Sequence, residues 1–183
     1  FNKICSEKPG KTFIASDGPR YGNKTDIKLC DEARNIIQEI DWECDVNTLF
    51  RENNLGCKKA VFEAISWFFN NVEEGIIIED DCIPNDSFFH FCNIMLDKYK
   101  YKRQVKAICG TNYLFGKYNR RNSYYFSPFI PIWGWATWKD TWDEVSLSLE
   151  SSKLPLIKEI IDKTFINQHF CNWLYSNLAG AIL

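Results

Sequence analysis

The stretch GIIIEDDCIPNDSF, residues 75–88, places an apolar run directly before three consecutive acids. The run 76–78 is apolar on both faces, which is typical of a strand at the centre of a parallel sheet. Glu79, Asp80 and Asp81 follow directly, so three carboxylates are adjacent in the sequence. Adjacent carboxylates repel one another, and burying one without a partner is costly. The stretch therefore predicts either a solvated turn or a divalent metal ion at the end of a buried strand.

The segments around this strand alternate between strand and helix patterns. The expected strands are 11–16, 44–50, 75–79 and 104–110. The expected helices are 26–40, 58–70 and 88–99, and a helix pair is expected to run to the end of the chain. Strands alternating with helices indicate an α/β sandwich with a largely parallel sheet. With no repeat or linker in the sequence, we expect a single domain, 1–183.

Composition excludes several classes of protein. The 183 residues, 45% of them hydrophobic, are enough to build one domain with a core. A net charge of −2 gives no indication of a nucleic-acid partner. No apolar run approaches the roughly 18–20 residues of a transmembrane helix. The start, FNKICSEKPG, lacks the features of a signal peptide and resembles the end of a helix, which leaves open that the sheet lacks its first strand.

Eight cysteines occur without any CxxC pair. Most lie within apolar patterns, and the sequence favours small core hydrophobes over a disulfide framework or a zinc site. A reducing cytoplasm is therefore the expected compartment.

The acids at the end of the central strand suit a hard cation. In open α/β sheets, ligands bind beyond the carboxyl ends of the strands. Mg²⁺ or Mn²⁺ there takes one or two protein carboxylates, and water and phosphate oxygens complete its shell. Such an ion offsets the repulsion between the acids and stabilises charge on a departing diphosphate. The alternative is a charged turn with acids favoured near a helix N-terminus.

Four segments in order carry a resemblance to a known family: IASDGPR (14–20), TLFRENNLGCKKAV (48–61), GIIIEDDCIPNDSFFHFC (75–92) and WGWATWKDTW (133–142). They resemble nucleotide-sugar glycosyltransferases of the GT-A fold. Among these, the similarity is to bacterial family-2-like enzymes related to the N-acetylglucosaminyltransferase that acts on protein N-glycans. The resemblance spans about residues 1–145 and implies a Rossmann-like sandwich whose mostly parallel central sheet is flanked by helices. Residues 1–110 would bind nucleotide, and 111–183 would face the acceptor.

The resemblance gives the three acids individual roles. They match the DxD-type motif of such enzymes, in which Asp81 would coordinate the metal that bridges the donor phosphates. Asp80 would face the ribose and nucleotide, and Glu79 would support the site or touch the nucleotide.

Two further residues match the nucleotide side of the family. Asp17 corresponds to the acid that accepts a hydrogen bond from uracil, and Arg51 to a basic residue near the nucleotide. Without the resemblance, Asp17 would fit a turn-forming Asp-Gly, and Arg51 would fit a surface ion pair.

The segment WGWATW corresponds to the acceptor side. Trp133 and Trp135 offer flat apolar faces for a sugar ring, and Gly134 allows close approach of the backbone. Trp138 and Trp142, four residues apart, are expected to pack inward.

The catalytic base is the least defined role. Similar enzymes invert the anomeric centre, which requires an acidic group that takes the proton of the acceptor hydroxyl. Relatives usually supply an Asp from a Trp-Asp motif, but the comparable stretch 167–178 contains no Asp. Asp143 and His169 are the remaining candidates.

Three hypotheses about function follow. The first is a metal-dependent glycosyltransferase that moves a sugar from a nucleotide-diphosphate donor, expected to be UDP-linked, to a glycan or another hydroxyl acceptor. The second is a nucleotidyltransferase on a similar scaffold. The third is a truncated or degenerate domain without catalysis. For all three we expect a cytoplasmic protein, with peripheral association at the inner membrane left open.

Overall fold

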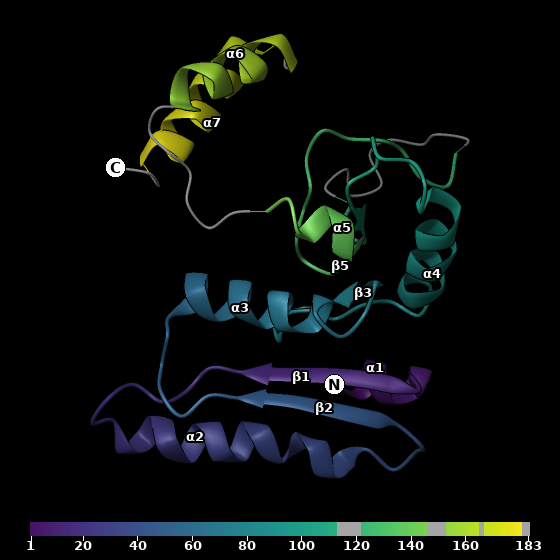
Figure 1. The fold of residues 1–183 in the computed structure, drawn as a ribbon, viewed down its shortest axis with the longest axis vertical. Coiled ribbons are helices and arrows are strands. Elements are labelled where there is room, and N and C mark those ends of the chain that lie inside the picture. The colour runs from purple at the N-terminus through teal and green to yellow at the C-terminus, as the bar shows by residue number, and fades with distance from the viewer. Residues whose placement is uncertain (113–121, 146–152, 165–166, 181–183) are drawn as a thin grey trace. The chain divides into compact units, whose positions relative to one another are not determined.

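The computed structural model describes residues 1–112, 122–145, 153–164 and 167–180 (Figure 1). It divides into two compact units. The first unit comprises Phe1–Tyr124 and Phe129–Glu144, and the second comprises Tyr125–Pro128 and Val145–Leu183. The WGWATW segment, expected on the acceptor side, belongs to the first unit.

Helices and strands follow the expected order closely. The first unit contains α1 (Asn2–Glu7), β1 (Lys11–Ser16), α2 (Lys24–Arg34), a 3-10 helix η1 (Asn35–Glu39), β2 (Asp45–Phe50), α3 (Cys57–Phe69), β3 (Glu74–Ile77), α4 (Phe88–Tyr99), β4 (Ile108–Cys109), β5 (Trp135–Trp138) and α5 (Lys139–Trp142). The second contains α6 (Leu154–Thr164) and α7 (Gln168–Gly180). The mixed α/β class and the terminal helix pair are therefore confirmed.

Strands β1 and β2 form a parallel pair, with Lys11 opposite Asp45 and Ser16 opposite Phe50. In Figure 1 this pair runs between α2 and α3. The ring of Phe13 in β1 packs edge-on against Trp67 of α3, with 5.1 Å between ring centroids. Parallel pairing brings the carboxyl ends of both strands to one edge, which positions the candidate site.

The second sheet corrects one expectation. Its order is β3-β5-β4, and β5 is antiparallel to both neighbours. Among the residues that the structure describes, β3 pairs only with β5, so the GIIIE strand does not lie at the centre of a parallel sheet. The physical reason is β5 itself, which is buried at all four positions and supplies the partner that the sequence pattern did not predict.

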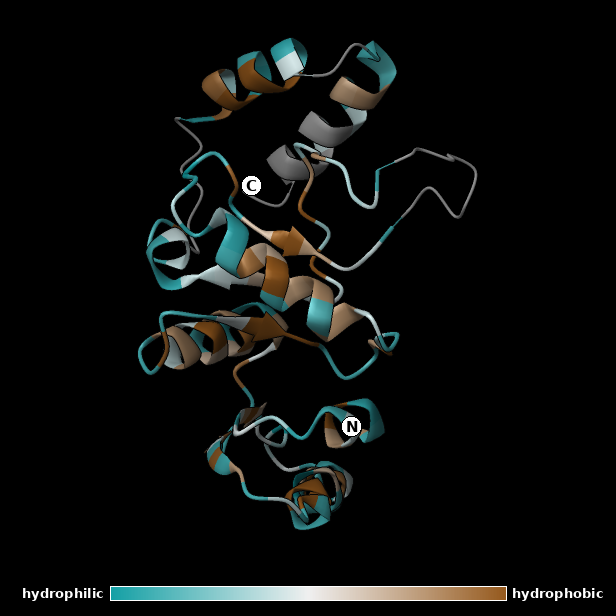
Figure 2. Cartoon of the chain, turned by 90° about the vertical axis from the view of Figure 1, so that its right-hand side faces the viewer, coloured by the Kyte–Doolittle hydropathy of each residue, from teal (hydrophilic) through white to brown (hydrophobic). Residues whose placement is uncertain are grey.

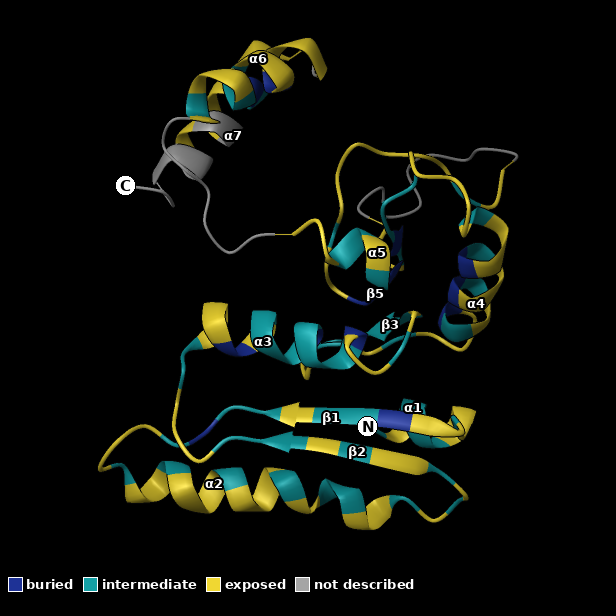
Figure 3. Ribbon diagram, in the orientation of Figure 1, coloured by how far each residue is buried: buried dark blue, intermediate teal, exposed yellow. Residues whose placement is uncertain are grey.

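The core of the first unit forms around β5. Phe88, Cys92 and Leu96 of α4 pack with Ala136 and Trp138 on one side. On the other side, Ile65 and Phe69 of α3 pack with Trp135. Figure 3 shows the buried positions on these elements, and Figure 2 shows that the helices carry both hydrophobic and hydrophilic residues. The apolar residues that recur at helical spacing in the sequence thus form the faces by which α3 and α4 pack into the core.

Burial keeps two thiols of the first unit, Cys92 and the half-buried Cys109, uncharged. Burial raises the pKa of Cys92 to about 12, and that of Cys109 to about 11. Both are therefore neutral at physiological pH. Of the eight cysteines, however, only Cys92 and Cys171 are buried, so the expected role as core hydrophobes holds for a minority.

In the second unit, α6 and α7 pack against each other through buried Ile161 and Cys171. The Cys171 thiol lies 3.7 Å from the Ile161 carbonyl oxygen, to which it donates. Within the described parts of both units, every helix is too short or too polar to cross a bilayer.

Candidate functional site

Asp17, the first residue after β1, organises the loop that follows β2. Its carboxylate accepts hydrogen bonds from the backbone N–H groups of Gly18 (2.9 Å), Leu55 (3.0 and 3.1 Å) and Gly56 (3.1 Å). The side chain of Asn54 donates a further bond, at 3.0 Å. Gly56 also begins α3 with a φ of 78°, a conformation that favours glycine. Asp17 therefore ties the carboxyl end of β1 to the start of α3.

Arg34, the last residue of α2, holds the same ends of the two strands together. Its guanidinium donates to the backbone carbonyl oxygens of Asp17 (3.1 Å) and Arg51 (2.6 Å). It also donates to the Ser16 hydroxyl at 3.3 Å and lies over the ring of Phe50, 5.2 Å from its centroid. One side chain thus bridges β1 and β2 where both strands end.

An open hollow of about 320 Å³ lies beside Asp17. Its lining residues come from the end of β1, the inner face of α2 and the loop after β2: Ser16, Asp17, Gly18, Asp26, Leu29, Cys30, Ala33 and Asn54. The loops approach closely here, because a Cβ on Gly18 would lie 2.4 Å from the backbone of Asn53. The hollow is therefore bordered by backbone that a larger residue at position 18 would displace.

The N-terminus of α2 forms one wall of the hollow. The Asn23 side chain caps the helix by accepting bonds from the N–H groups of Thr25 and Asp26. Arg20 donates to both carboxylate oxygens of Asp26, at 2.6 and 2.8 Å. This hydrogen bonding lowers the pKa of Asp26 from 3.8 to about 2. Asp26 thus stays ionised, with its charge offset by Arg20.

The Arg20–Asp26 pair gives a pH-dependence that can be measured. Because the folded pKa of Asp26 lies below 3.8, its contribution to stability is present above that pH and is lost as pH falls through about 2. Titration of the Asp26 carboxyl carbon by NMR is expected to show a midpoint near 2 in the native chain. In Arg20→Gln the midpoint should return toward 3.8. Lys28→Gln, which removes a cation elsewhere on α2, should leave it unchanged, and an unmoved midpoint in Arg20→Gln would contradict the assignment.

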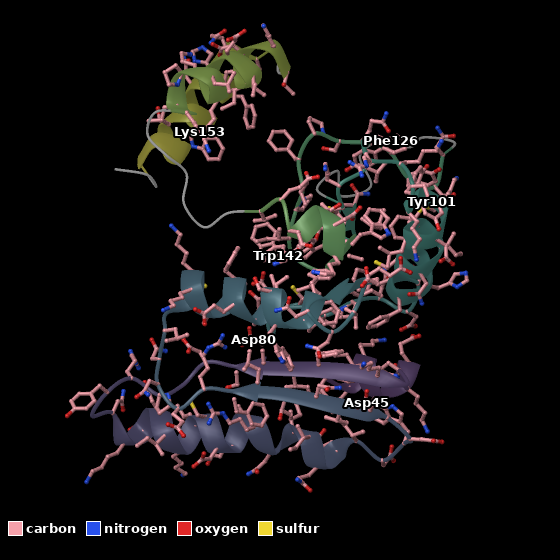
Figure 4. The ribbon with its side chains drawn as sticks, in the orientation of Figure 1. Asp45, Asp80, Tyr101, Phe126, Trp142 and Lys153 are labelled. Atoms are coloured by element: carbon pink, nitrogen blue, oxygen red, sulfur yellow. The ribbon has the colours of Figure 1, made fainter. Side chains whose placement is uncertain are left out.

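The three consecutive acids lie in the turn after β3, where Cys82 N–H bonds back to the Glu79 carbonyl oxygen at 3.1 Å. Glu79 is half-buried, whereas Asp80 and Asp81 are exposed, and Figure 4 labels Asp80. Across the described ranges, no group of three or more His, Cys, Asp or Glu side chains is arranged to hold a metal ion. The oxygen donors suit Mg²⁺ or Mn²⁺, which needs only one or two protein carboxylates. The oxygen ligands of the turn are therefore suited to a hard cation, but their arrangement does not surround a metal site.

Arg51 follows β2 at the same edge as Asp17. Its side chain is 12% exposed and pairs with Glu63 of α3 at 3.1 Å. This is the ion pair that the sequence left open as an alternative. The Arg51 guanidinium already forms an ion pair with a residue of α3. Its expected contact with a nucleotide stays a prediction.

The acceptor-side tryptophans separate into two environments. The Trp133 side chain is 51% exposed, whereas Trp135 is 8% exposed and packs in the core with Phe69. Trp135 therefore has no free face for a sugar ring, and this part of the expectation is corrected. Gly134 has a φ of 72°, and its carbonyl oxygen accepts a bond from Gly110 N–H at 2.9 Å. Trp133 stays the candidate for ligand contact.

Trp138 and Trp142 pack inward, as expected. Trp138 is 5% exposed in the core. Trp142 packs against Phe62 and Phe69 of α3, and its indole N–H donates to the Ser66 hydroxyl at 3.1 Å.

Neither of the two candidate catalytic bases lies in an environment typical of a catalytic base. Asp143 is exposed and pairs with Lys139 one helical turn earlier, at 3.1 Å. His169 is exposed on α7, in the second unit. The structure does not bring the two together in one unit, and both assignments stay predictions.

Sequence reasoning missed Arg34 and Asp26. Arg34 and Asp26 lie on an amphipathic helix, where charged residues usually face solvent. The Asn23-Lys-Thr-Asp26 sequence is an N-cap pattern that predicts the start of α2 and could have placed Asp26 at the helix entrance.

Comparison with protein-family models, with curated proteins and with solved structures finds no match for this chain.

Proposed function

We propose that this chain is a metal-dependent glycosyltransferase that binds a nucleotide-diphosphate sugar, UDP-linked, at the carboxyl ends of β1 and β2. One observation carries the proposal: Asp17 and Arg34 fix the ends of two parallel strands beside an open hollow. In α/β proteins this edge is where nucleotides bind. The order of the four sequence segments supplies the choice of glycosyl transfer and of the GT-A scaffold.

The nucleobase would enter the hollow beside Asp17. Both carboxylate oxygens of Asp17 already accept bonds from the protein, and three of these come from the backbone of residues 55 and 56. The Asn54 side chain is the donor most easily exchanged, because a side chain can rotate while the backbone is fixed by α3. A uracil N–H would take its place on Oδ2.

Asp81 would hold the metal, with Asp80 toward the ribose and Glu79 supporting the turn. When bound, Mn²⁺ or Mg²⁺ supplies positive charge that stabilises the departing diphosphate. The chain's own acids leave most of the metal's shell to water and phosphate oxygens, as such ions prefer. Trp133 would face the acceptor, and Asp143 or His169 would take the proton of its hydroxyl.

Calorimetric titration of UDP, GDP and CDP, each with and without Mn²⁺, tests the proposal. We expect UDP to bind in a Mn²⁺-dependent way, and Asp81→Asn to weaken this binding by about tenfold or more through loss of a charged ligand. Asp86→Asn is the matched control. It removes the same charge from the same loop, where Asp86 is 88% exposed and pairs with Lys3.

The products distinguish the classes of reaction. Release of UDP from a UDP-sugar indicates transfer or hydrolysis, whereas pyrophosphate indicates nucleotidyl transfer. Binding with neither product would favour the non-catalytic hypothesis. If no nucleotide bound to the folded protein under any condition, the glycosyltransferase proposal would fail, and the acids would be a solvated turn.

We place the protein in a reducing compartment, the cytoplasm, as part of the same proposal. Cys5, Cys30, Cys44, Cys57, Cys82, Cys92 and Cys109 are free thiols in the structure, which supports a reducing environment. Peripheral association with a membrane stays a prediction.

A further inference from the structure

The segment KYKYKRQVK, residues 98–106, is the most basic stretch of the chain. It contains five Lys or Arg residues and no acid, in a protein whose net charge is −2. The segment begins in the last turn of α4 and ends shortly before β4. Cations at a helix C-terminus are favoured by the helix dipole, but that effect falls off within the last turn. The charges beyond Tyr99 therefore need another explanation.

A cavity of about 150 Å³ lies along this segment, outside the Asp17 hollow. Its lining includes four cations of this segment, together with one tryptophan and two acids from residues 138–144: Lys100, Lys102, Arg103, Lys106, Trp138, Asp140 and Glu144. Figure 4 labels Tyr101 at this end of α4, and its side chain is 89% exposed. The cavity therefore opens beside an exposed, cation-rich turn.

Two of the four cations are neutralised within the protein. Lys100 pairs with Glu74 of β3 at 3.1 Å, and Lys106 pairs with Glu144 at 2.6 Å. Within the described parts of the chain, neither Lys102 nor Arg103 forms an ion pair, although the charge of Arg103 adds to that of Lys106 in lowering the pKa of Glu144. Asp140 is the remaining acid of the lining. Glu74 lies outside the lining but neutralises Lys100, so four cations are set against three carboxylates and one positive charge is in excess. Lys102 and Arg103 are the two cations of the lining that form no ion pair among the described residues.

Trp138 adds a second observation. Its side chain is 5% exposed, and its indole N–H is buried without a hydrogen-bond partner among the described residues. A buried donor left unpartnered is costly, so such groups usually mark an absent water or ion. An indole N–H can only donate, and its partner must therefore be an acceptor.

We propose that this cavity binds a phosphate group, held by Lys102, Arg103 and the indole N–H of Trp138. A planar guanidinium is suited to phosphate because two of its N–H groups can bind two oxygens at once. The phosphate can come from a lipid headgroup or from a soluble phosphate compound, since both present the same oxygens. The site is separate from the nucleotide site proposed above and does not depend on it.

The competing explanation is internal. Glu74 stands opposite Trp138 in the β3–β5 register, and its Oε2 is, like the indole N–H, buried without a hydrogen-bond partner among the described residues. A water molecule bridging the two side chains would satisfy both groups without any phosphate. In that case, added phosphate would leave the indole N–H unaffected.

NMR of the whole chain separates these explanations. The indole N–H signal of Trp138 is assigned by its loss in Trp138→Phe. Inorganic phosphate is then titrated against chloride at equal ionic strength, so that general screening is the same in both series. We expect a saturable shift of this signal with phosphate alone, and a loss of affinity of about tenfold or more in the double variant Lys102→Ala/Arg103→Ala.

The matched control is the double variant Lys24→Ala/Lys28→Ala, which removes the same charge from exposed positions on α2 and should bind phosphate like the native chain. Absence of a saturable shift, or equal loss in both double variants, would overturn the proposal.

Vesicles distinguish the two sources of phosphate. Sedimentation is measured with vesicles of equal parts phosphatidylglycerol and phosphatidylcholine, and with phosphatidylcholine alone as the neutral reference. Binding to the anionic vesicles that is lost in Lys102→Ala/Arg103→Ala but kept in Lys24→Ala/Lys28→Ala assigns a lipid headgroup. A phosphate-dependent indole shift without vesicle binding assigns a soluble phosphate compound.

Discussion

Replacing Asp17 by alanine is expected to lower the free energy of unfolding of the first unit by about 2–4 kcal/mol. The carboxylate accepts bonds from the N–H groups of Gly18, Leu55 and Gly56, and removing it leaves these donors without their acceptor. Hydrogen bonds to a charged group are stronger than those between neutral groups. Since Asp17 and Leu55 are half-buried, water can replace only part of what is lost.

Urea unfolding measures the change in stability, and amide hydrogen exchange measures where it arises. The N–H groups of Leu55 and Gly56 should lose protection in Asp17→Ala, whereas those of β5 should lose it only as far as global stability falls. Because the chain has two units, the exchange data also show whether the urea transition reports on the first unit alone.

Asp17→Asn is the informative control for this prediction. The carboxamide keeps one acceptor oxygen and the size of the side chain, so we expect an intermediate loss of stability. If Leu55 and Gly56 exchanged as slowly in Asp17→Ala as in the native chain, the loop would be held by other contacts. The view of Asp17 as the anchor of the site would then be wrong.

Periodicity in the sequence was sufficient to predict most individual elements. The expected strand 11–16 coincides with β1, and the helices expected at 58–70 and 88–99 correspond to α3 and α4 within about one residue. These segments were predictable because each buries one regular face. Their local pattern and their packing therefore carry the same information.

Strand pairing was not predictable from the same patterns. β5 is buried at Trp135, Ala136, Thr137 and Trp138 alike, so it lacks the alternation that identifies a strand. The sequence drew attention to WGWATW as a ligand-binding segment, whereas the structure uses it as the central strand between β3 and β4. Pairing depends on partners distant in the chain, and a local pattern contains no information about them.

The candidate site was predictable only in part. Asp17 was expected at the end of the first strand and lies there, but its carboxylate is bound by backbone N–H groups, which leave no trace in a sequence. Arg34 looks like any charged residue of an amphipathic helix. Its role as a bridge between β1 and β2 is evident only from the structure, in which its guanidinium donates to carbonyl oxygens at the ends of both strands.

Replacing Arg34 by methionine is expected to cost about 2–4 kcal/mol of stability, with a weakened junction between β1 and β2. Methionine keeps much of the apolar stem but donates no hydrogen bond. The carbonyl oxygens of Asp17 and Arg51 therefore lose their shared donor, and the contact with the Phe50 ring loses its charge. Urea unfolding gives the magnitude, and exchange of the Arg51 N–H, which donates to the Ser16 carbonyl oxygen at the end of β1, reports on the junction.

Two further variants show whether geometry or charge is responsible. Arg34→Lys keeps the charge, but one ammonium group cannot reproduce the planar set of donors that reaches both carbonyls, so most of the loss should persist. Arg20→Met removes an arginine that is 70% exposed and pairs with Asp26, and should lower stability far less than Arg34→Met because exposed ion pairs contribute little. If Arg34→Lys matched the native chain, positive charge alone would be sufficient at this position. If Arg34→Met cost no more than Arg20→Met, Arg34 would be an ordinary surface residue, and the strand ends would owe their arrangement to Asp17 and the loop after β2.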